Sequence, residues 1–251
     1  MMPIHQKRSL SFIGMFALAG VLTCLSSAQS ASAVVLFDGS LGTSPSIQGL
    51  SYAAFPSGSY ETVNPTNTQV DTSSNNAIQA GYSTTSVPLN RAVGFDVRVD
   101  VQIVAQSTGF TNANRSGFSL IALDAQARGI EIAFTETSIF AQNSSPLFVA
   151  AETVARDNTA MSRFDLQVRG ETWTLLADNT SVLTGPVRDY SAFAGFPDVY
   201  ETPNFLFIGD NTTSARGAWR VAYLSARNIP EPAMAGVLLA CATLVLRRKP
   251  T

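Results

Sequence analysis

Apolar and polar residues alternate along most of the chain, with the period of two that is typical of β-strands with one buried face. The clearest run is 94–104, where Phe95, Val97 and Val99 begin an apolar series separated by charged and amide residues. Gly, Asn, Ser and Pro separate such runs, and helical spacing is nearly absent. The pattern predicts these strands: Val34–Asp38, Ile47–Ala54, Tyr60–Val63, Ala77–Tyr82, Gly94–Val104, Gly117–Leu123, Gly129–Thr135, Ser138–Gln142, Leu147–Ala151, Phe164–Arg169, Thr172–Ala177, Asn204–Gly209 and Ala218–Ala226.

About a dozen strands without helices favour an all-β fold, an antiparallel β-sandwich. The order of the strand sequences is informative: Gly-Phe-Ser-Leu at 117–120, Gly-Ile-Glu-Ile-Ala-Phe at 129–134, Ser-Ile-Phe-Ala at 138–141, Phe-Asp-Leu-Gln-Val at 164–168 and Trp-Thr-Leu-Leu-Ala-Asp at 173–178. This series resembles the jelly-roll sandwich of concanavalin-like lectins, glucanases and laminin-G-type domains. The resemblance implies a fold of that kind over about 93–226.

The C-terminal end, 229–251, has three parts in order. Pro230, Glu231 and Pro232 stop any strand, since proline cannot continue a ladder. Ala233–Leu246 is apolar apart from one threonine, and as a helix it reaches only about 20 Å, short of a ~30 Å hydrocarbon core. A basic stop ends the chain, formed by Arg247, Arg248 and Lys249.

This tail resembles the PEP-CTERM sorting signal of Gram-negative and related bacteria. The resemblance implies transient membrane insertion and recognition by an exosortase-type sorting enzyme. That enzyme is expected to cut near Pro230–Pro232 and to release the body to the cell surface or extracellular matrix. Retention of the tail as an anchor stays open, as does a small C-terminal helix that docks on the body.

The N-terminus has the features of a secretory signal peptide, 1–33. His5, Lys7 and Arg8 form a positive region, 10–25 is apolar, and Ala31 and Ala33 form a small-residue site for signal peptidase. An uncleaved membrane helix is the alternative. The two segments bracket a predicted exported sandwich domain, 34–228.

Composition narrows the chemistry of that domain. Cys24, Cys241, His5, Lys7 and Lys249 are the chain's only Cys, His and Lys residues, and all lie in the two predicted targeting segments. The body therefore has no residue for a disulfide, a His or Cys metal site, or a catalytic triad that needs His. It keeps eleven arginines against seventeen acids, about −6 in charge, which argues against nucleic acid as a partner.

One strand suggests an enzyme. Glu131 and Glu136 in Glu-Ile-Ala-Phe-Thr-Glu resemble the nucleophile and acid of laminarinase-type glucanases, although Ala133 stands where that family has Asp. A retaining glycosidase needs its carboxyls about 5 Å apart, whereas a spacing of five residues puts these on opposite faces unless a bulge intervenes. The alternative has Glu131 on the wet face of a strand and Glu136 at a turn, with no catalytic residue.

Two Asp-Asn-Thr turns could bind Ca²⁺. Asp178 and Asp210 begin them, and carboxylate oxygens suit this ion in extracellular loops. The same residues are also common in turns, where Asp and Asn accept hydrogen bonds from their own backbone.

Aromatic residues in the 188–203 loop are the candidates for carbohydrate contact: Tyr190, Phe193, Phe196 and Tyr200. Flat aromatic rings can stack on sugar rings. Trp173 and Trp219 lie in predicted strands and are expected to be buried.

The sequence thus favours an exported, non-enzymatic surface or matrix protein that contacts polysaccharide. A laminarinase-like glycoside hydrolase and a purely structural or adhesive protein are the alternatives.

Overall fold

The computed structural model describes residues 32–108 and 112–229. The predicted signal peptide up to Ala31 and the predicted sorting tail from Pro230 lie outside the described residues. Ala33 lies inside them and is exposed just before the first strand. Within this part of the chain, no helix is both long and apolar enough to cross a bilayer.

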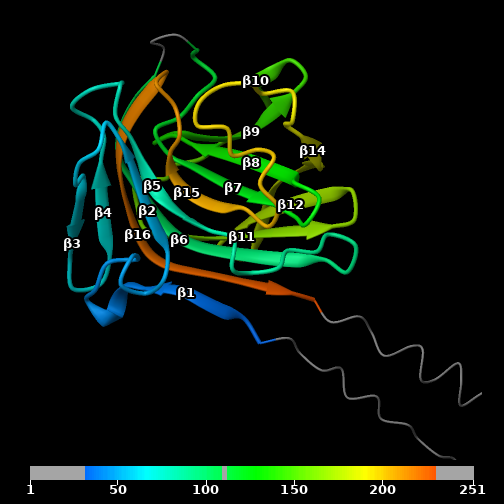
Figure 1. Cartoon of the computed structure of the whole chain (residues 1–251), viewed down its shortest axis with the longest axis horizontal. Helices are drawn as coiled ribbons and strands as arrows, with labels where there is room; N and C mark the ends of the chain where they lie inside the picture. The colour runs from blue at the N-terminus through cyan, green and yellow to red at the C-terminus, as the bar shows by residue number, and fades with distance from the viewer. Residues whose placement is uncertain (1–31, 109–111, 230–251) are drawn as a thin grey trace, which may run out of the picture. The chain divides into compact units, whose positions relative to one another are not determined.

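The described chain is a two-layer antiparallel sandwich (Figure 1). One layer, sheet A, has the order β13-β12-β11-β6-β16-β4-β3, with β1 also paired to β16. The other, sheet B, has the order β10-β9-β8-β7-β15-β5-β2, with β14 paired to β8. The elements are β1 (Val34–Asp38), the 3-10 helix η1 (Gly39–Leu41), β2 (Ser51–Phe55), β3 (Glu61–Val63), β4 (Thr68–Asp71), β5 (Gln79–Thr84), β6 (Phe95–Thr108), β7 (Ser119–Leu123), β8 (Arg128–Phe134), β9 (Ser138–Ser144), β10 (Leu147–Ala155), β11 (Ser162–Arg169), β12 (Thr172–Ala177), β13 (Thr180–Pro186), β14 (Arg188–Asp189), β15 (Leu206–Asp210) and β16 (Ala215–Asn228).

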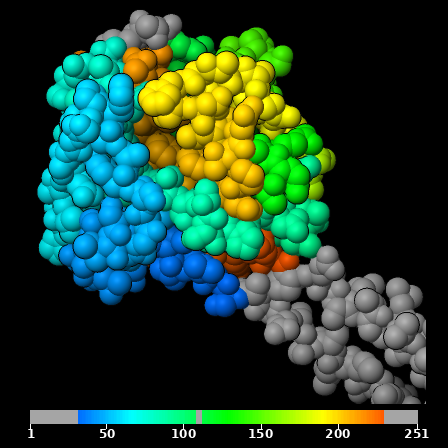
Figure 2. All heavy atoms as spheres, in the orientation of Figure 1, coloured from blue at the N-terminus to red at the C-terminus, as the bar shows by residue number. Residues whose placement is uncertain are grey.

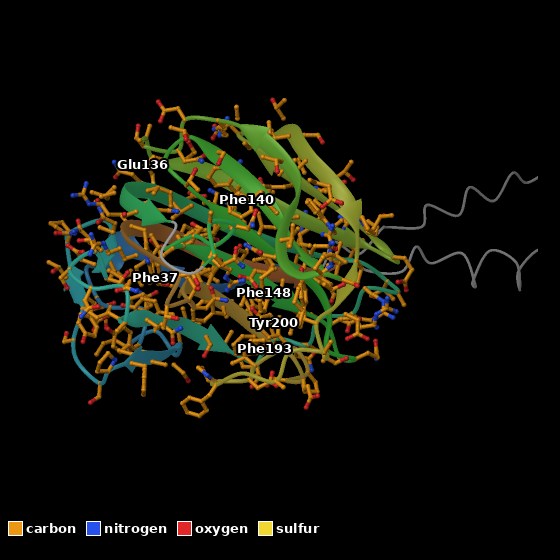
Figure 3. All side chains as sticks on the ribbon, turned by 90° about the horizontal axis from the view of Figure 1, so that it is seen from above. Phe37, Glu136, Phe140, Phe148, Phe193 and Tyr200 are labelled. Carbon is orange, nitrogen blue, oxygen red and sulfur yellow. The ribbon has the colours of Figure 1, made fainter. Side chains whose placement is uncertain are left out.

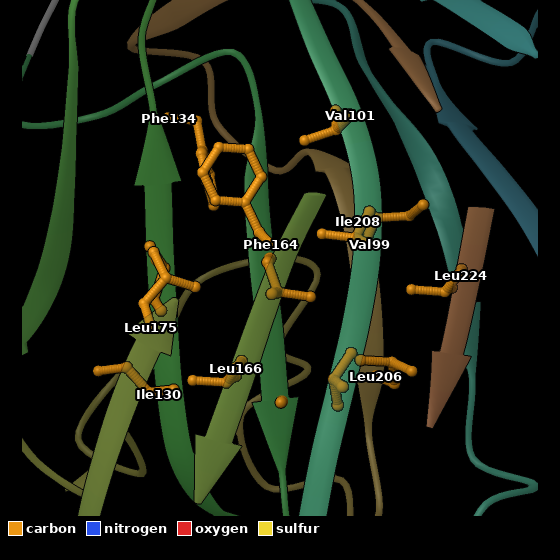
Figure 4. Close-up of a cluster of buried hydrophobic side chains, with 14 of the residues drawn as sticks. Val99, Val101, Ile130, Phe134, Phe164, Leu166, Leu175, Leu206, Ile208 and Leu224 are labelled. Carbon is orange, nitrogen blue, oxygen red and sulfur yellow. The ribbon is translucent and has the colours of Figure 1, made fainter. Parts of the chain in front are cut away.

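The core lies between the two sheets and consists of the alternate residues of each strand that point inward. The odd-numbered residues of β6 from Phe95 to Ile103 are buried, and they face inward residues of sheet B such as Ile208 (Figure 4). Trp173 and Trp219 are fully buried, as predicted, and the indole N–H of Trp173 donates to the carbonyl of Pro186 at 2.9 Å. The prediction of an all-β antiparallel sandwich is confirmed.

The two ends of the described chain lie side by side in sheet A. β16 pairs with β6 from Ala215 to Asn228, and its other edge pairs first with β4 and then with β1, where Val34 faces Ala226. The first and last strands are therefore neighbours although almost the whole domain separates them in the sequence.

Some predicted strand boundaries are wrong. The predicted strand from Ile47 begins only at Ser51, because 44–49 forms turns and Ile47 is 76% exposed. Three strands were not predicted: β4, β13 and β14. Each carries too few alternating apolar residues to give a strand signal.

Candidate functional site: a cleft on the outer face of sheet B

The outer face of sheet B is largely apolar. Residues whose side chains alternate away from the core form a second buried cluster with the chain that covers them: Ile121, Leu123, Tyr190, Tyr200 and Phe205. Phe148, Phe193 and Phe207 pack against this cluster. An exposed face of a sandwich is normally polar, so this face is built to be covered in part.

The covering segment is 190–205, here called the outer loop. Its start is fixed by β14, where Arg188 donates two hydrogen bonds to the carboxylate of Glu152 at 2.6 and 2.8 Å. Its end is fixed by Asn204, whose backbone N–H donates to Asp124 and whose side chain accepts from Leu89. The loop is therefore held across the sheet at both ends, although it contains no strand.

Tyr190 ties the outer loop to two strands. Its hydroxyl donates to the carbonyl of Gln142 in β9 at 2.7 Å and accepts from the N–H of Glu131 in β8 at 3.1 Å. It thus bridges β8 and β9 beyond their last backbone pair at Ile132. Burial raises the pKa of Tyr190, so the hydroxyl stays protonated.

Glu131 lies at the centre of the site, completely buried beneath the outer loop. It forms an ion pair with Arg115 at 3.1 Å and accepts hydrogen bonds from Tyr200 at 2.5 Å and Asn211 at 3.1 Å. Glu131 points outward from sheet B, as the non-catalytic interpretation predicted, but it is not wet, because the outer loop covers that face and removes it from water. Three polar partners offset the cost of burying the carboxylate.

Arg115 also stacks on an aromatic ring, with its guanidinium carbon 4.2 Å from the ring centre of Phe148. The cation therefore has a carboxylate on one side and a π face on another. Both contacts favour the charged form in a site that is otherwise dry.

Glu136 lies apart from this network. It follows β8 at the turn into β9, as the non-catalytic interpretation of the strand predicted, and it is partly exposed. Figure 3 shows Glu136 well away from Phe148, Phe193 and Tyr200, and Tyr200 is the residue that contacts Glu131. The structure therefore does not bring the two carboxylates together.

Asp210 is the second buried acid near the site. Its carboxylate accepts from the Thr72 hydroxyl at 2.6 Å and from the backbone N–H of Thr212 at 3.1 Å. Burial raises its pKa to about 7, and the hydrogen bonds and Arg115 oppose this shift only in part. The side chain is therefore largely uncharged in mildly acidic solution.

Asp178 lies at the β12–β13 turn, in the other sheet. Its carboxylate accepts from Arg156 at 2.8 Å and from the N–H of Arg163 at 3.1 Å. The structure does not bring Asp178 near Asp210. Across residues 32–108 and 112–229, no group of three or more His, Cys, Asp or Glu side chains could hold a metal ion.

Beside the outer loop, the face opens into a cleft of about 640 Å³. Figure 2 shows the hollow between the light blue residues that include β2 and the yellow outer loop, with the gold residues around β15 at its base. Phenylalanines from β2, β10, the outer loop and β15 line it: Phe55, Phe148, Phe193, Phe196, Phe205 and Phe207. Arg115, Tyr200 and 210–214 also line it.

The mouth of the cleft carries two exposed rings. Phe196 is 84% exposed and Phe55 is 57% exposed, and their centres lie 6.3 Å apart in an edge-to-face arrangement. Two neighbouring exposed rings beside an apolar cleft extend its apolar surface and form a candidate binding surface.

A glycine shapes the cleft floor. A Cβ atom at Gly81 would lie 2.6 Å from the ring of Phe207 and 2.5 Å from the carbonyl oxygen of Ile208. The ring thus lies flat on the β5 backbone, where only glycine leaves room.

The four predicted loop aromatics divide into two kinds. Tyr190 and Tyr200 are buried, with their hydroxyls engaged inside, and so present no ring to solvent. Phe193 is half-buried, and Phe196 is open at the mouth. Four further residues of the site, Phe55, Phe148, Phe207 and Arg115, were not predicted from the sequence. Of these, only Phe55 had a local signal, as an apolar residue at the end of a strand that Pro56 stops.

No protein-family model matches the sequence, and no curated protein matches it. The fold is similar to a solved carbohydrate esterase from Shiga toxin-encoding bacteriophage phi24B, with 13% identity over 79% of this chain and 100% of that one, at a TM-score of 0.52. A Bacillus subtilis protein of unknown function with a galectin-like fold matches with 8% identity over 79% and 98% of the two chains. Its TM-score of 0.48 is too low to support an argument.

Topology and similarity together define the class. The chain is an all-β antiparallel sandwich of two sheets, and it shares this fold with the phage carbohydrate esterase. On this fold the chain carries the outer loop and the phenylalanine-lined cleft.

Proposed function

We propose that this chain is an exported, non-enzymatic protein of the cell surface or extracellular matrix that binds carbohydrate in the cleft on sheet B. The observation that carries the proposal is the set of phenylalanine rings around a partly open cleft, two of them exposed at its mouth. A sugar ring has apolar C–H faces and polar edges, so it suits aromatic walls beside polar groups.

The size and lining of the cleft support a small-ligand site. Its volume lies within the range of about 300–1,000 Å³ usual for ligand pockets, and a few polar groups accompany the apolar wall. Gln79 and Ser83 of β5 and Thr213 supply amide and hydroxyl groups to the lining of the cleft. A lectin-like fold is consistent with this use, although fold alone does not assign function.

A non-enzymatic role agrees with the local chemistry. Glu131 is held by Arg115, Tyr200 and Asn211, and Glu136, the second carboxyl of the glucanase resemblance, lies apart from this network. Hydrolysis of laminarin by the chain, lost in Glu131→Gln and Glu136→Gln, would overturn this part of the proposal.

Export rests on the two predicted targeting segments. The sorting tail would deliver the body through an exosortase-type enzyme after signal peptidase has cut near Ala33. Fractionation of the native host tests this: we expect a shortened form at the surface or in the matrix. Full-length protein in the cytoplasm would refute it.

Binding is tested on a glycan array with and without calcium, followed by titration calorimetry with the glycans that bind. We expect Phe196→Ala to weaken binding by about 1–2 kcal/mol, the scale of one aromatic contact. Ile47→Ala is the matched control, because Ile47 is 76% exposed but does not line the cleft. Absence of binding to every glycan would favour a purely structural or adhesive role.

A further inference from the structure

The wall of the cleft is hydrocarbon rather than amphipathic. Its accessible rings are phenylalanines, such as Phe55, Phe193 and Phe196, and these have no hydroxyl or indole N–H. Tyr200 also lines the cleft, but its hydroxyl donates to the buried Glu131. The aromatic wall can therefore contribute apolar contact and no hydrogen bond.

The charged residues that line the cleft already have partners. Arg115 is the only cation that lines the cleft in the described part of the chain, and Glu131 pairs with it at 3.1 Å. Asp210 is held by Thr72 and by the backbone of Thr212, and burial shifts its pKa to about 7, which reduces its charge. A carboxylate on a ligand would meet no free cation here, so its desolvation would be uncompensated and would weaken binding.

Neutral hydrogen-bonding groups also line the cleft. Gln79 and Ser83 project outward from β5, on the face opposite to the core residues Ala80 and Tyr82, and Thr213 is exposed. Amide N–H and hydroxyl groups can donate to a carbonyl oxygen or to a sugar hydroxyl. An apolar wall next to neutral donors matches an acyl group, which has a methyl at one end and a carbonyl at the other.

From these features we infer that the cleft selects neutral glycans that carry acyl groups, such as acetyl esters, over the same glycans without them and over uronate polymers. The inference rests on the proposed carbohydrate binding and specifies its ligand class. The methyl of the acyl group contacts the phenylalanine wall, while its carbonyl accepts from the neutral side chains that also line the cleft.

The test is calorimetric titration of the exported protein, expressed from the full chain, with acetylated xylo- and manno-oligosaccharides. The same oligosaccharides after alkaline deacetylation and an oligogalacturonate form the comparison arms. We expect the acetylated forms to bind at least about tenfold more tightly than the deacetylated forms. We also expect little change in affinity between low and high salt, since no ion pair forms.

The variant Phe55→Ala/Phe196→Ala removes two exposed rings and should bring the ratio of the two affinities close to one, whereas Ile47→Ala should leave it unchanged. Equal affinity for acetylated and deacetylated forms would overturn the inference and leave carbohydrate binding intact. Tighter binding of the uronate would also overturn it. Failure to bind any of these glycans would overturn the inference, whereas the proposed carbohydrate binding is decided separately by the glycan array.

Discussion

The hydroxyl of Tyr200 donates a hydrogen bond of 2.5 Å to the carboxylate of Glu131, and so joins the outer loop to the centre of sheet B. Tyr200 is 3% exposed and Glu131 is fully buried. Burial and the nearby carboxylate raise the pKa of Tyr200, so it donates this proton at any physiological pH. The cleft wall formed by the outer loop depends on this contact.

We expect Tyr200→Phe to lower the free energy of unfolding by about 1–3 kcal/mol, because a buried carboxylate loses one of its donors. Denaturant unfolding measures the change. Tyr60→Phe is the matched control, since the Tyr60 hydroxyl makes a longer, exposed hydrogen bond of 3.3 Å to Pro56. Equal losses in the two variants would contradict the assigned role of Tyr200.

Breaking the buried ion pair should cost more. Arg115→Met leaves Glu131 with an uncompensated charge, and loss of one partner of a buried pair typically costs about 3–5 kcal/mol. The double variant Arg115→Met/Glu131→Leu should recover much of this loss, since it removes the charge as well. A double-mutant cycle on unfolding free energies gives the result, and simple additivity would show that the two residues do not interact.

Stability should depend on the ionisation of Asp210. Below its unfolded-state value of 3.8 the group is protonated in both states, and as pH rises toward about 7 only the unfolded chain releases the proton. The contribution of this group to stability is therefore present at low pH and is lost as pH rises through about 7. The loss is at most about 4 kcal/mol for a shift of three units.

Asp210→Asn should remove this dependence. The amide can still accept from the backbone of Thr212 and can donate to the Thr72 hydroxyl, which keeps its hydrogen bond to the carbonyl of Gly217. Unfolding is measured for both proteins between pH 4 and 8, and the stability of the variant relative to the parent should increase with pH. A constant difference across this range would refute the assignment.

Gly81→Ala should disturb the cleft floor. The new methyl would overlap the Phe207 ring and the Ile208 carbonyl, and overpacking of this kind costs about 1–3 kcal/mol. Gly58→Ala is the control, because its nearest neighbour is the side chain of Tyr60 at 3.1 Å, on an exposed loop that can yield. Unfolding and glycan titration are measured together, and both should change only at Gly81.

The strand pattern predicted the sandwich because alternation is a local property. β6 is an example. The predicted strand, Gly94–Val104, begins one residue before β6 does and covers most of its length, Phe95–Thr108. β13 was not predicted because Thr180, Thr184 and Gly185 are residues common in turns. It forms a strand because its backbone pairs with β12.

The site was harder to predict because it depends on contacts distant in sequence. Glu131 alternates with inward residues, so its own strand indicates a wet position. Only the outer loop, with Tyr190 and Tyr200 about sixty to seventy residues later, turns that position into an interior. In the same way, nothing around Arg115 in the sequence indicates that it lies over Phe148 and against β8.

β16 pairs with β6 along its whole length, and this pairing determines how the sheet responds to force. A pull on Asn228 acts along β16 and loads its hydrogen bonds to β6 in parallel, so that many of them must break together. Both ends of the described chain belong to sheet A, whereas the cleft opens on the outer face of sheet B. Tension applied to the last strand would thus load the sheet that does not carry the cleft.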